Sequence, residues 1–233
     1  MQSHKAQLGW AFIFARYLPM LDDNWEVVNG PAAHHIEGLN AINTVNVIEA
    51  MVTMLIDHKQ KTADILIFND QALCELHRTG TLFLLKRPGV YRDTPVIVQN
   101  TSTGDVLHRP PPHGEVPRWM SEFYEELKAQ WMGGDALDVA AFALWRVNWV
   151  HPFKNGNGRT ARAFAYACLC GHLGVILPGA PTVIDQIMVT RDEYEVCLRT
   201  GDKADEAGKR DLAPMKDYLN RLLQIQISSL ATP

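Results

Sequence analysis

The chain has 233 residues, of which 47% are hydrophobic and 21% are charged, which is enough apolar material for one globular domain with a core. Its formal net charge of -4 gives no broad attraction to nucleic acid or to an anionic membrane, so any phosphate must be bound by a local site. Four cysteines (Cys74, Cys168, Cys170 and Cys197) form no CxxC pair and are expected to be buried thiols, which is typical of a cytoplasmic protein.

The first segment contains an apolar run from Gly9 to Met20 that Arg16 interrupts. The run is too short to span a bilayer, and no small-residue cleavage site follows it. We therefore expect residues 1–30 to form an N-terminal extension packed on the domain.

Two helices are predicted next. Apolar residues recur at helical spacing from Pro31 to about Lys59, and Asn29 and Gly30 form a plausible start signal, so residues 31–59 are expected to form one long helix. A shorter helix is predicted from Asp70 to Thr79, capped by Asn69 or Asp70 and ended near Gly80.

The composition of the sequence changes between Lys86 and Pro117, where repeated prolines exclude a long helix. Within this stretch the short β-branched run Val96, Ile97, Val98 and Gln99 precedes a segment rich in turn formers, and Val106 to His108 can return antiparallel. A small hairpin is therefore predicted. Because no other strand is convincing, its edges are expected to remain available to a partner chain.

Helical signals resume after Pro117 and continue to the end of the chain. The fold class is therefore mainly α, with one inserted β-hairpin in a core domain over residues 60–233 and a single globular unit overall. The helices are predicted over Trp119–Trp131, Asp135–Trp149, Asn157–Leu173, Arg191–Thr200 and Ala213–Ser229.

A candidate phosphate site lies at the start of the helix over 157–173. Gly156 and Gly158 let the backbone approach a ligand closely, and the first amides of a helix have no internal partners, so they form an anion site with the helix dipole. Arg159 and Arg162 are three residues apart and share a helix face, where two guanidiniums suit a polyphosphate.

His151 precedes this site across the same loop. An imidazole beside a phosphate site can accept the proton of an attacking hydroxyl group. Phe153 is interpreted as the apolar anchor of the loop, and Pro152 limits its freedom. Each of these residues alone is more often structural, but the combination over twelve positions indicates a catalytic loop.

The segment His151 to Arg162 resembles the signature of the Fic (filamentation induced by cAMP) domain family, His-x-Phe-x-(Asp/Glu)-Gly-Asn-Gly-Arg-x-x-Arg, at every specified position except one. Pro88 to Arg92 resembles the segment that precedes the flap of that family, and the 96–108 hairpin would be the flap. Asp211 to Pro214 resembles the start of the family's C-terminal helix. The resemblance covers roughly residues 30–225.

The resemblance implies a mainly helical Fic fold and a protein adenylyltransferase that moves AMP from ATP to a Ser, Thr or Tyr hydroxyl. His151 would be the general base. Asn157 and the amides of Gly156 and Gly158 would hold the α-phosphate, while Arg159 and Arg162 would bind the β- and γ-phosphates. The flap would align a target protein by strand addition.

The one departure is Asn155, where the family usually carries Asp or Glu to hold Mg²⁺. A neutral amide oxygen adds no charge, so magnesium binding is expected to be weakened. Three alternatives remain open: the phosphates recruit the metal alone, the enzyme is slow, or the fold binds nucleotide without catalysis. We favour retained activity with weakened metal binding.

A second resemblance concerns Ala33 to Gly38, which partly matches the inhibitory motif (Ser/Thr)-x-x-x-Glu-(Gly/Asn) of Fic proteins. In the family this glutamate pairs with the second motif arginine, so Glu37 is expected to pair with Arg162 and block the γ-phosphate. The alternative is a solvated helix residue without such a role.

Other functions stay open at this point. The donor could carry another base or be another phosphate-linked group, and Glu37 could support hydrolytic removal of AMP. A catalytically weak nucleotide-sensing or antitoxin-like module is suggested by Asn155 together with Glu37. No nucleic-acid or membrane partner is expected, and a homo-oligomer is compatible with the sequence.

Overall fold

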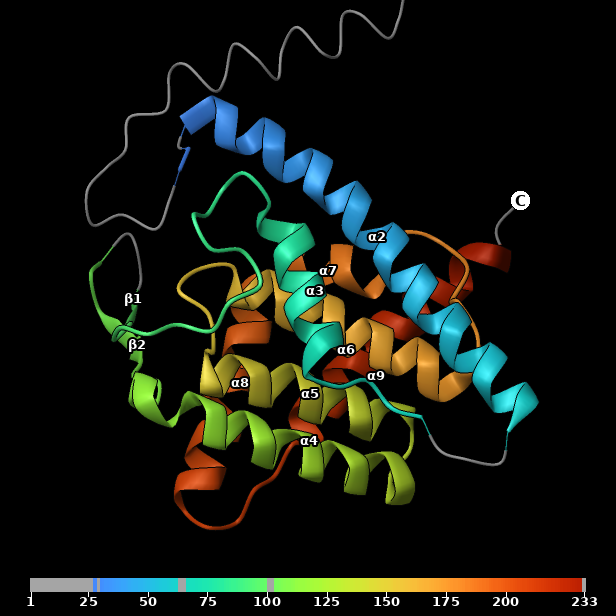
Figure 1. Cartoon of the computed structure of the whole chain (residues 1–233). Helices are drawn as coiled ribbons and strands as arrows, with labels where there is room; N and C mark the ends of the chain where they lie inside the picture. Colours follow the sequence, from blue (N-terminus) through green and yellow to red (C-terminus); the bar gives the residue numbers. More distant parts are fainter. Residues whose placement is uncertain (1–26, 29, 63–65, 100–102, 232–233) are drawn as a thin grey trace, which may run out of the picture.

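The computed structural model describes residues 27–28, 30–62, 66–99 and 103–231. The predicted fold class, mainly α with an inserted hairpin, is confirmed (Figure 1). The elements are α2 (Gly30–Lys61), α3 (Asp70–Thr81), β1 (Val98–Gln99), β2 (Val106–His108), η1 (His113–Glu115), α4 (Val116–Gly133), α5 (Ala136–Val150), α6 (Asn157–Leu173), α7 (Val183–Val189), α8 (Arg191–Glu206), α9 (Ala213–Ser228) and η2 (Ser229–Ala231).

Helices α5 and α6 form the centre of the core. Both are apolar on nearly every side, which is the pattern of a helix surrounded by other elements. Phe164 of α6 makes edge-on or tilted contacts with Phe68 and Phe123, and these rings join α6 to the chain before α3 and to α4. The carboxyl end of α5 and the amino end of α6, which bracket the motif loop, are therefore fixed by the best-packed part of the domain.

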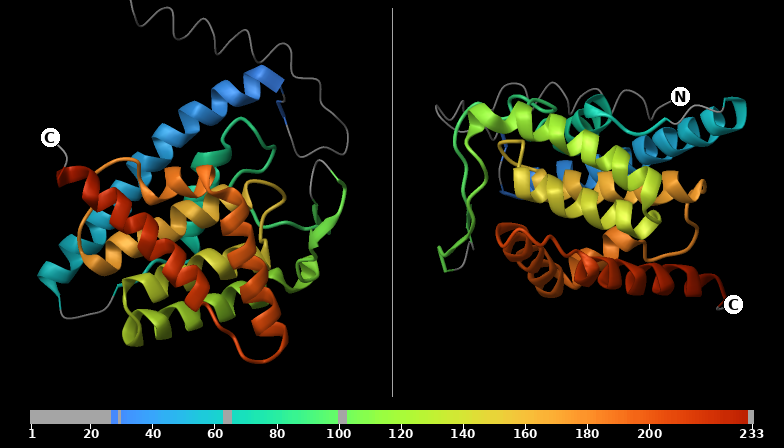
Figure 2. Two further views of the ribbon diagram at one scale, coloured as in Figure 1. Left: turned by 180° about the vertical axis from the view of Figure 1, so that it is seen from behind. Right: turned by 90° about the horizontal axis from the view of Figure 1, so that it is seen from below.

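The remaining helices form layers around this pair. Helix α2 crosses α6 and α3, and α9 packs on α5, α7 and α8. Figure 2 shows α8 and α9 as a layer beneath α5, with the hairpin projecting at one end of the bundle. The motif loop therefore opens toward a space bordered by the hairpin on one side and by α8 on the other.

Helix α2 is long and apolar enough, by length and composition alone, to cross a membrane. In this fold its Ile48, Val52 and Leu55 are buried in the core, and Asn40 donates a hydrogen bond to the Leu82 carbonyl at 2.9 Å. These contacts hold one side of α2 against the domain, while Leu39, Ile42, Val45 and Met54 on the same helix are exposed.

Several boundaries differ from the sequence prediction. Strand β1 includes only Val98 and Gln99, because Val96 and Ile97 make no ladder and the register with β2 is irregular. The short helix α7 was not predicted. The apolar run from Gly9 to Met20 lies outside the described residues, as does most of the predicted extension 1–30.

Candidate active site

The motif loop joins α5 to α6 through two residues with left-handed backbone. His151 ends α5 with φ 51°, and Gly156 precedes α6 with φ 78°. The side chain of Asn157, the first residue of α6, accepts a hydrogen bond from the Phe153 amide and donates one to the Phe153 carbonyl, both at 2.8 Å. Asn157 is only 2% exposed, so its side chain holds the loop closed.

Helix α3 packs against the motif loop through His77. The His77 ring stacks on Phe153 with centroids 3.7 Å apart, and its Nδ1 accepts from the Gly89 amide at 2.7 Å. Nδ1 is therefore the unprotonated nitrogen, and Nε2 donates to the Asn155 carbonyl at 2.9 Å. His77 was not predicted as part of the site, because its partner lies 78 residues further along the chain.

Gly156 cannot carry a side chain in this arrangement. Its φ is positive, and an added Cβ would lie 2.6 Å from Thr81 Cγ2. Gly156→Ala is expected to lower the free energy of unfolding by about 1–2 kcal/mol for backbone strain and by about 1–3 kcal/mol more for the collision. Denaturant unfolding measures the loss.

Gly104→Ala is the matched control, because Gly104 has φ 76° but nothing within 4 Å of the added Cβ. Its loss in free energy of unfolding should come from the backbone strain alone. Equal losses in the two variants would contradict the close contact between α3 and the loop.

The imidazole of His151 is held in one tautomer. Its Nδ1 lies 3.3 Å from the Asn148 carbonyl, which can only accept, so Nδ1 carries the proton and Nε2 carries the lone pair. Burial, against the opposing effect of the Asn148 bond and with a smaller contribution from His108 and Arg92, lowers the pKa of His151 to about 4. His151 is therefore neutral near pH 7 and can accept a proton.

A pH dependence of stability follows from His77, which is buried, and His151, which is half-buried. Burial lowers the pKa of both His77 and His151 to about 4. Between about pH 6.5 and pH 4 the unfolded chain binds more protons than the folded one, so stability rises with pH in this window. Acidification should lower the free energy of unfolding by about 1.4 kcal/mol per pH unit for each histidine.

The measurement is urea unfolding at several pH values across that window, for the parent and for His77→Gln. The glutamine amide can replace both hydrogen bonds of His77 but does not titrate. In His77→Gln the slope of the free energy of unfolding against pH should become shallower by about 1.4 kcal/mol per pH unit, the contribution of one histidine. An unchanged slope would show that His77 is not buried as a neutral group.

The two motif arginines occupy different environments. Arg159 Nη1 lies 2.7 Å from Glu37 Oε1, and the two side chains are 35% and 41% exposed. Arg162 runs back over Gly158, where an added Cβ would lie 3.3 Å from its Nη1. Its Nε is buried and has no hydrogen-bond partner in the described part of the chain, and burial lowers the pKa of this guanidinium.

The expected pairing of Glu37 with Arg162 is therefore wrong. Glu37 pairs with Arg159, the first motif arginine. The reason is the course of α2, which passes the first turn of α6 where Arg159 lies. Arg162 lies three residues further along α6, and it faces Tyr194 of α8.

The residues at the expected metal position do not form a cation site. Asn155 Oδ1 accepts a hydrogen bond from the Gly156 amide at 2.6 Å, so this oxygen is directed into the loop. Within the described ranges, no group of three or more His, Cys, Asp or Glu side chains could hold a metal ion. These ranges therefore supply no set of protein ligands for Mg²⁺.

The motif loop, the start of α6, the hairpin, α7 and α8 together line one cleft of about 430 Å³. The loop and α6 provide His151, Asn155 to Arg159 and Arg162, and the hairpin provides Val98, Gln99, Leu107 and His108. The predicted flap residues Val96 and Ile97 do not line it. The opposite wall is formed by α7 and α8, including Ile187, Arg191, Tyr194 and Arg199, which sequence reasoning missed because helical periodicity does not show which exposed face borders a ligand.

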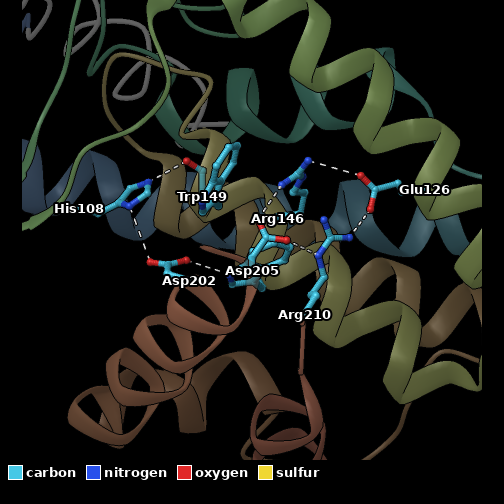
Figure 3. Close-up of polar contacts among 8 residues, drawn as sticks. His108, Glu126, Arg146, Trp149, Asp202, Asp205 and Arg210 are labelled. Atoms are coloured by element: carbon cyan, nitrogen blue, oxygen red, sulfur yellow. Dashed lines mark hydrogen bonds and ion pairs between the residues drawn. The ribbon is translucent and has the colours of Figure 1, made fainter. Parts of the chain in front are cut away.

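A polar and aromatic network joins the hairpin, α5 and α8 (Figure 3), and its members His108, Trp149 and Asp202 line the cleft. His108 Nε2 lies 2.8 Å from the Trp149 carbonyl, and its Nδ1 lies 3.7 Å from Asp202. Asp202 also accepts from the Trp145 indole at 2.9 Å. The buried Arg146 lies over the ring of Trp149 in the same helix, 4.5 Å from its centroid, and its Nη1 lies 3.9 Å from Asp205 of α8, so it joins α5 to α8.

Comparison with known families identifies the central part of the chain. Residues 67–169 match the family model described as the Fic/DOC family. This region is similar to a Fic domain. The matched segment runs from the start of α3 into α6 and contains His77, the hairpin, His151 and both motif arginines. Fic-domain proteins are generally transferases, and the family includes AMPylators.

Solved Fic structures share the fold. A Fic-domain signaling protein from Bacteroides thetaiotaomicron aligns with a TM-score of 0.57 at 20% identity, over 81% of this chain and 69% of its own. A Fic family protein from Desulfovibrio desulfuricans aligns with a TM-score of 0.54 at 19% identity, over 100% and 75%. Fic-1 from C. elegans gives 0.52 at 23% identity, over 80% of this chain but only 51% of its own. No curated protein matches the sequence.

Proposed function

We propose that this chain is a protein adenylyltransferase that transfers AMP from ATP to a hydroxyl side chain of a target protein. The observation that carries the proposal is the meeting of a neutral His151 and the amino end of α6 in one cleft. His151 has its Nδ1 committed to Asn148, and Arg159 and Arg162 line the same cleft. A base beside an anion site is what transfer of a phosphate group to a hydroxyl requires.

In the proposed reaction the target hydroxyl oxygen attacks the α-phosphorus of ATP. The new bond joins that oxygen to phosphorus, and the bond between the α-phosphorus and its bridging oxygen to the β-phosphate breaks. The hydroxyl proton passes to His151 Nε2, and pyrophosphate leaves with the electron pair of the broken bond. Positioning and charge stabilisation supply the catalysis.

The phosphates would bind at the start of α6. The amides of its first turn have no intrahelical acceptors, and Arg159 and Arg162 add two positive charges. The bound phosphates would also raise the pKa of His151 from about 4 toward neutrality, because negative charge favours the imidazolium form. The base would thus become stronger only when the donor is bound.

The hairpin would receive the target. Among the described residues β1 pairs only with β2, so each strand has an unpaired edge. Val98 and Gln99 line the cleft that contains His151. An extended target segment added to this edge would lie beside the base.

Glu37 would restrain the donor. Its carboxylate occupies one donor of Arg159, which a phosphate oxygen would otherwise use. An ion pair this exposed contributes at most about 1 kcal/mol by itself. The restraint therefore rests on the packing of α2, whose buried Ile48, Val52 and Leu55 hold Glu37 in place.

One alternative has a specific observation in its favour. Asn155 directs its oxygen into the loop and Glu37 occupies Arg159, which together suit a module that binds a nucleotide with little catalysis. The anion site also fits other phosphate-linked donors, because its contacts are with phosphate groups.

The test incubates the Glu37→Gly chain with each α-labelled nucleoside triphosphate in turn. Strongest labelling of protein by ATP supports the proposal. If only another nucleoside triphosphate labels the protein, that nucleotide takes the place of ATP as the donor in the proposed reaction. Tight binding of ATP without covalent label would favour the binding module.

Asn155→Asp tests the proposed weakness toward metal. One carboxylate oxygen can keep the Gly156 bond while the second offers a charged ligand, so magnesium should bind more tightly to the nucleotide complex. Calorimetric titration of Mg²⁺ into the ATP complex is expected to show a gain of about tenfold, or about 1.4 kcal/mol. An unchanged affinity would mean that position 155 does not reach the metal.

A further inference from the structure

The carboxyl end of α5 is held by the segment that carries the hairpin. Four successive carbonyls, 149–152, each accept a hydrogen bond from this segment. His108 Nε2 donates to the first at 2.8 Å, Arg92 Nη2 and Nε donate to the next two at 3.4 and 2.8 Å, and the Arg92 amide donates to the fourth at 2.8 Å. Carbonyls at a helix end lack intrahelical partners, so these bonds cap α5 at the residue that carries the base.

Arg92 also joins the two ends of the hairpin segment. Its guanidinium donates to the Pro111 carbonyl at 2.6 Å and to the Thr94 carbonyl at 3.5 Å. The residue is 3% exposed, and the acceptors of these four guanidinium bonds are neutral backbone carbonyls. A planar fork of five N–H donors can serve several carbonyls at once, which a lysine cannot do.

We infer that Arg92 and His108 are positioning residues that fix the hairpin and the peptide of His151 as one unit. A target strand aligned on the hairpin then presents its hydroxyl group at a set distance from His151 Nε2. This inference rests on the proposed transfer reaction. It goes beyond that proposal by naming the contacts that keep acceptor and base in register.

The geometry explains why such a clamp is needed. His151 has left-handed backbone, which a non-glycine residue keeps only when its surroundings hold it there. The clamp bonds to the backbone on both sides of the base and leaves the nucleotide-binding arginines untouched. Loss of the clamp should therefore slow transfer without weakening nucleotide binding, since an error of about 1 Å in position costs about 100-fold in rate.

The first test is independent of activity. NMR titration follows the imidazole of His151 in the parent, in Arg92→Lys and in Arg92→Met. Removing the nearby positive charge and loosening the peptide should raise the pKa of His151 in Arg92→Met. Arg92→Lys keeps the charge but loses the fork, so its shift should be smaller while the His151 resonances broaden.

Arg87→Met is the matched control, because Arg87 lies before the hairpin and its ion pair is with the exposed Asp93. It should leave the His151 titration unchanged. A His151 titration that is the same in all four proteins would overturn the inference, whatever the outcome of any activity assay.

The second test measures transfer in chains that also carry Glu37→Gly. His108→Ala is expected to lower kcat by about 10- to 100-fold with ATP affinity within about twofold. His108→Gln can still donate to the Trp149 carbonyl and should recover most of the rate. Equal rates in His108→Ala and the Glu37→Gly parent, or parallel loss of rate and ATP affinity, would overturn the clamp. Absence of transfer in the Glu37→Gly parent would instead refute the proposed function, and the titration would still decide the clamp.

Discussion

His151→Ala, made in a chain that also carries Glu37→Gly, is expected to lower the initial rate of AMP incorporation by about 10²- to 10⁴-fold. This is the usual contribution of one positioned general base. The reason is specific to this site. The Asn148 carbonyl fixes the proton on Nδ1, so Nε2 is the nitrogen left to accept the hydroxyl proton.

The measurement is incorporation of α-labelled AMP over time, with ATP binding measured in parallel. His113→Ala is the control, because His113 is exposed on η1 and does not line the cleft. ATP affinity should change little in both variants, since the phosphate contacts come from α6. A His151→Ala chain that transfers AMP at the rate of the His113→Ala control would remove His151 from the mechanism.

Glu37→Gly by itself is expected to raise self-labelling by up to about fivefold. The carboxylate lies 2.7 Å from Arg159, and both side chains are partly exposed, so the ion pair contributes at most about 1 kcal/mol. Because each 1.4 kcal/mol corresponds to about a tenfold change in binding, about 1 kcal/mol corresponds to about fivefold. Removing the carboxylate should therefore free Arg159 for a phosphate.

Glu49→Gly is the matched control, because Glu49 is an exposed residue of the same helix and its replacement costs the same helix propensity. It should leave self-labelling at the parent level. A similar rise in both variants would show that a loosened α2 is the cause and that the Glu37 carboxylate has no direct part. No rise in either would exclude inhibition by Glu37.

The helices were predictable because their signals are local. Helix α6 begins and ends at the predicted residues, Asn157 and Leu173, since Gly156 and Gly174 both have left-handed backbone that stops a helix. The cap of α3 by Asn69 is also local, and the sequence predicts it. Helix α7 escaped prediction because seven residues show too little periodicity.

The site was predictable only as far as the motif itself extends. His151 and the two arginines lie in one continuous segment, so their approach to each other follows from the helix geometry. The partner of Glu37 depends on the crossing of α2 over α6, which the sequence does not fix. Arg92 and His77 were missed as parts of the site because their partners lie 59 and 78 residues away.

The central claim, that this cleft forms a covalent bond between AMP and a protein hydroxyl, is tested most directly by mass spectrometry of the Glu37→Gly chain after incubation with ATP and Mg²⁺. We predict a product heavier by one adenylyl group, located on a Ser, Thr or Tyr side chain and absent when His151→Ala is added. Bound ATP with no adduct on the protein, or an adduct that forms equally without His151, would contradict the account.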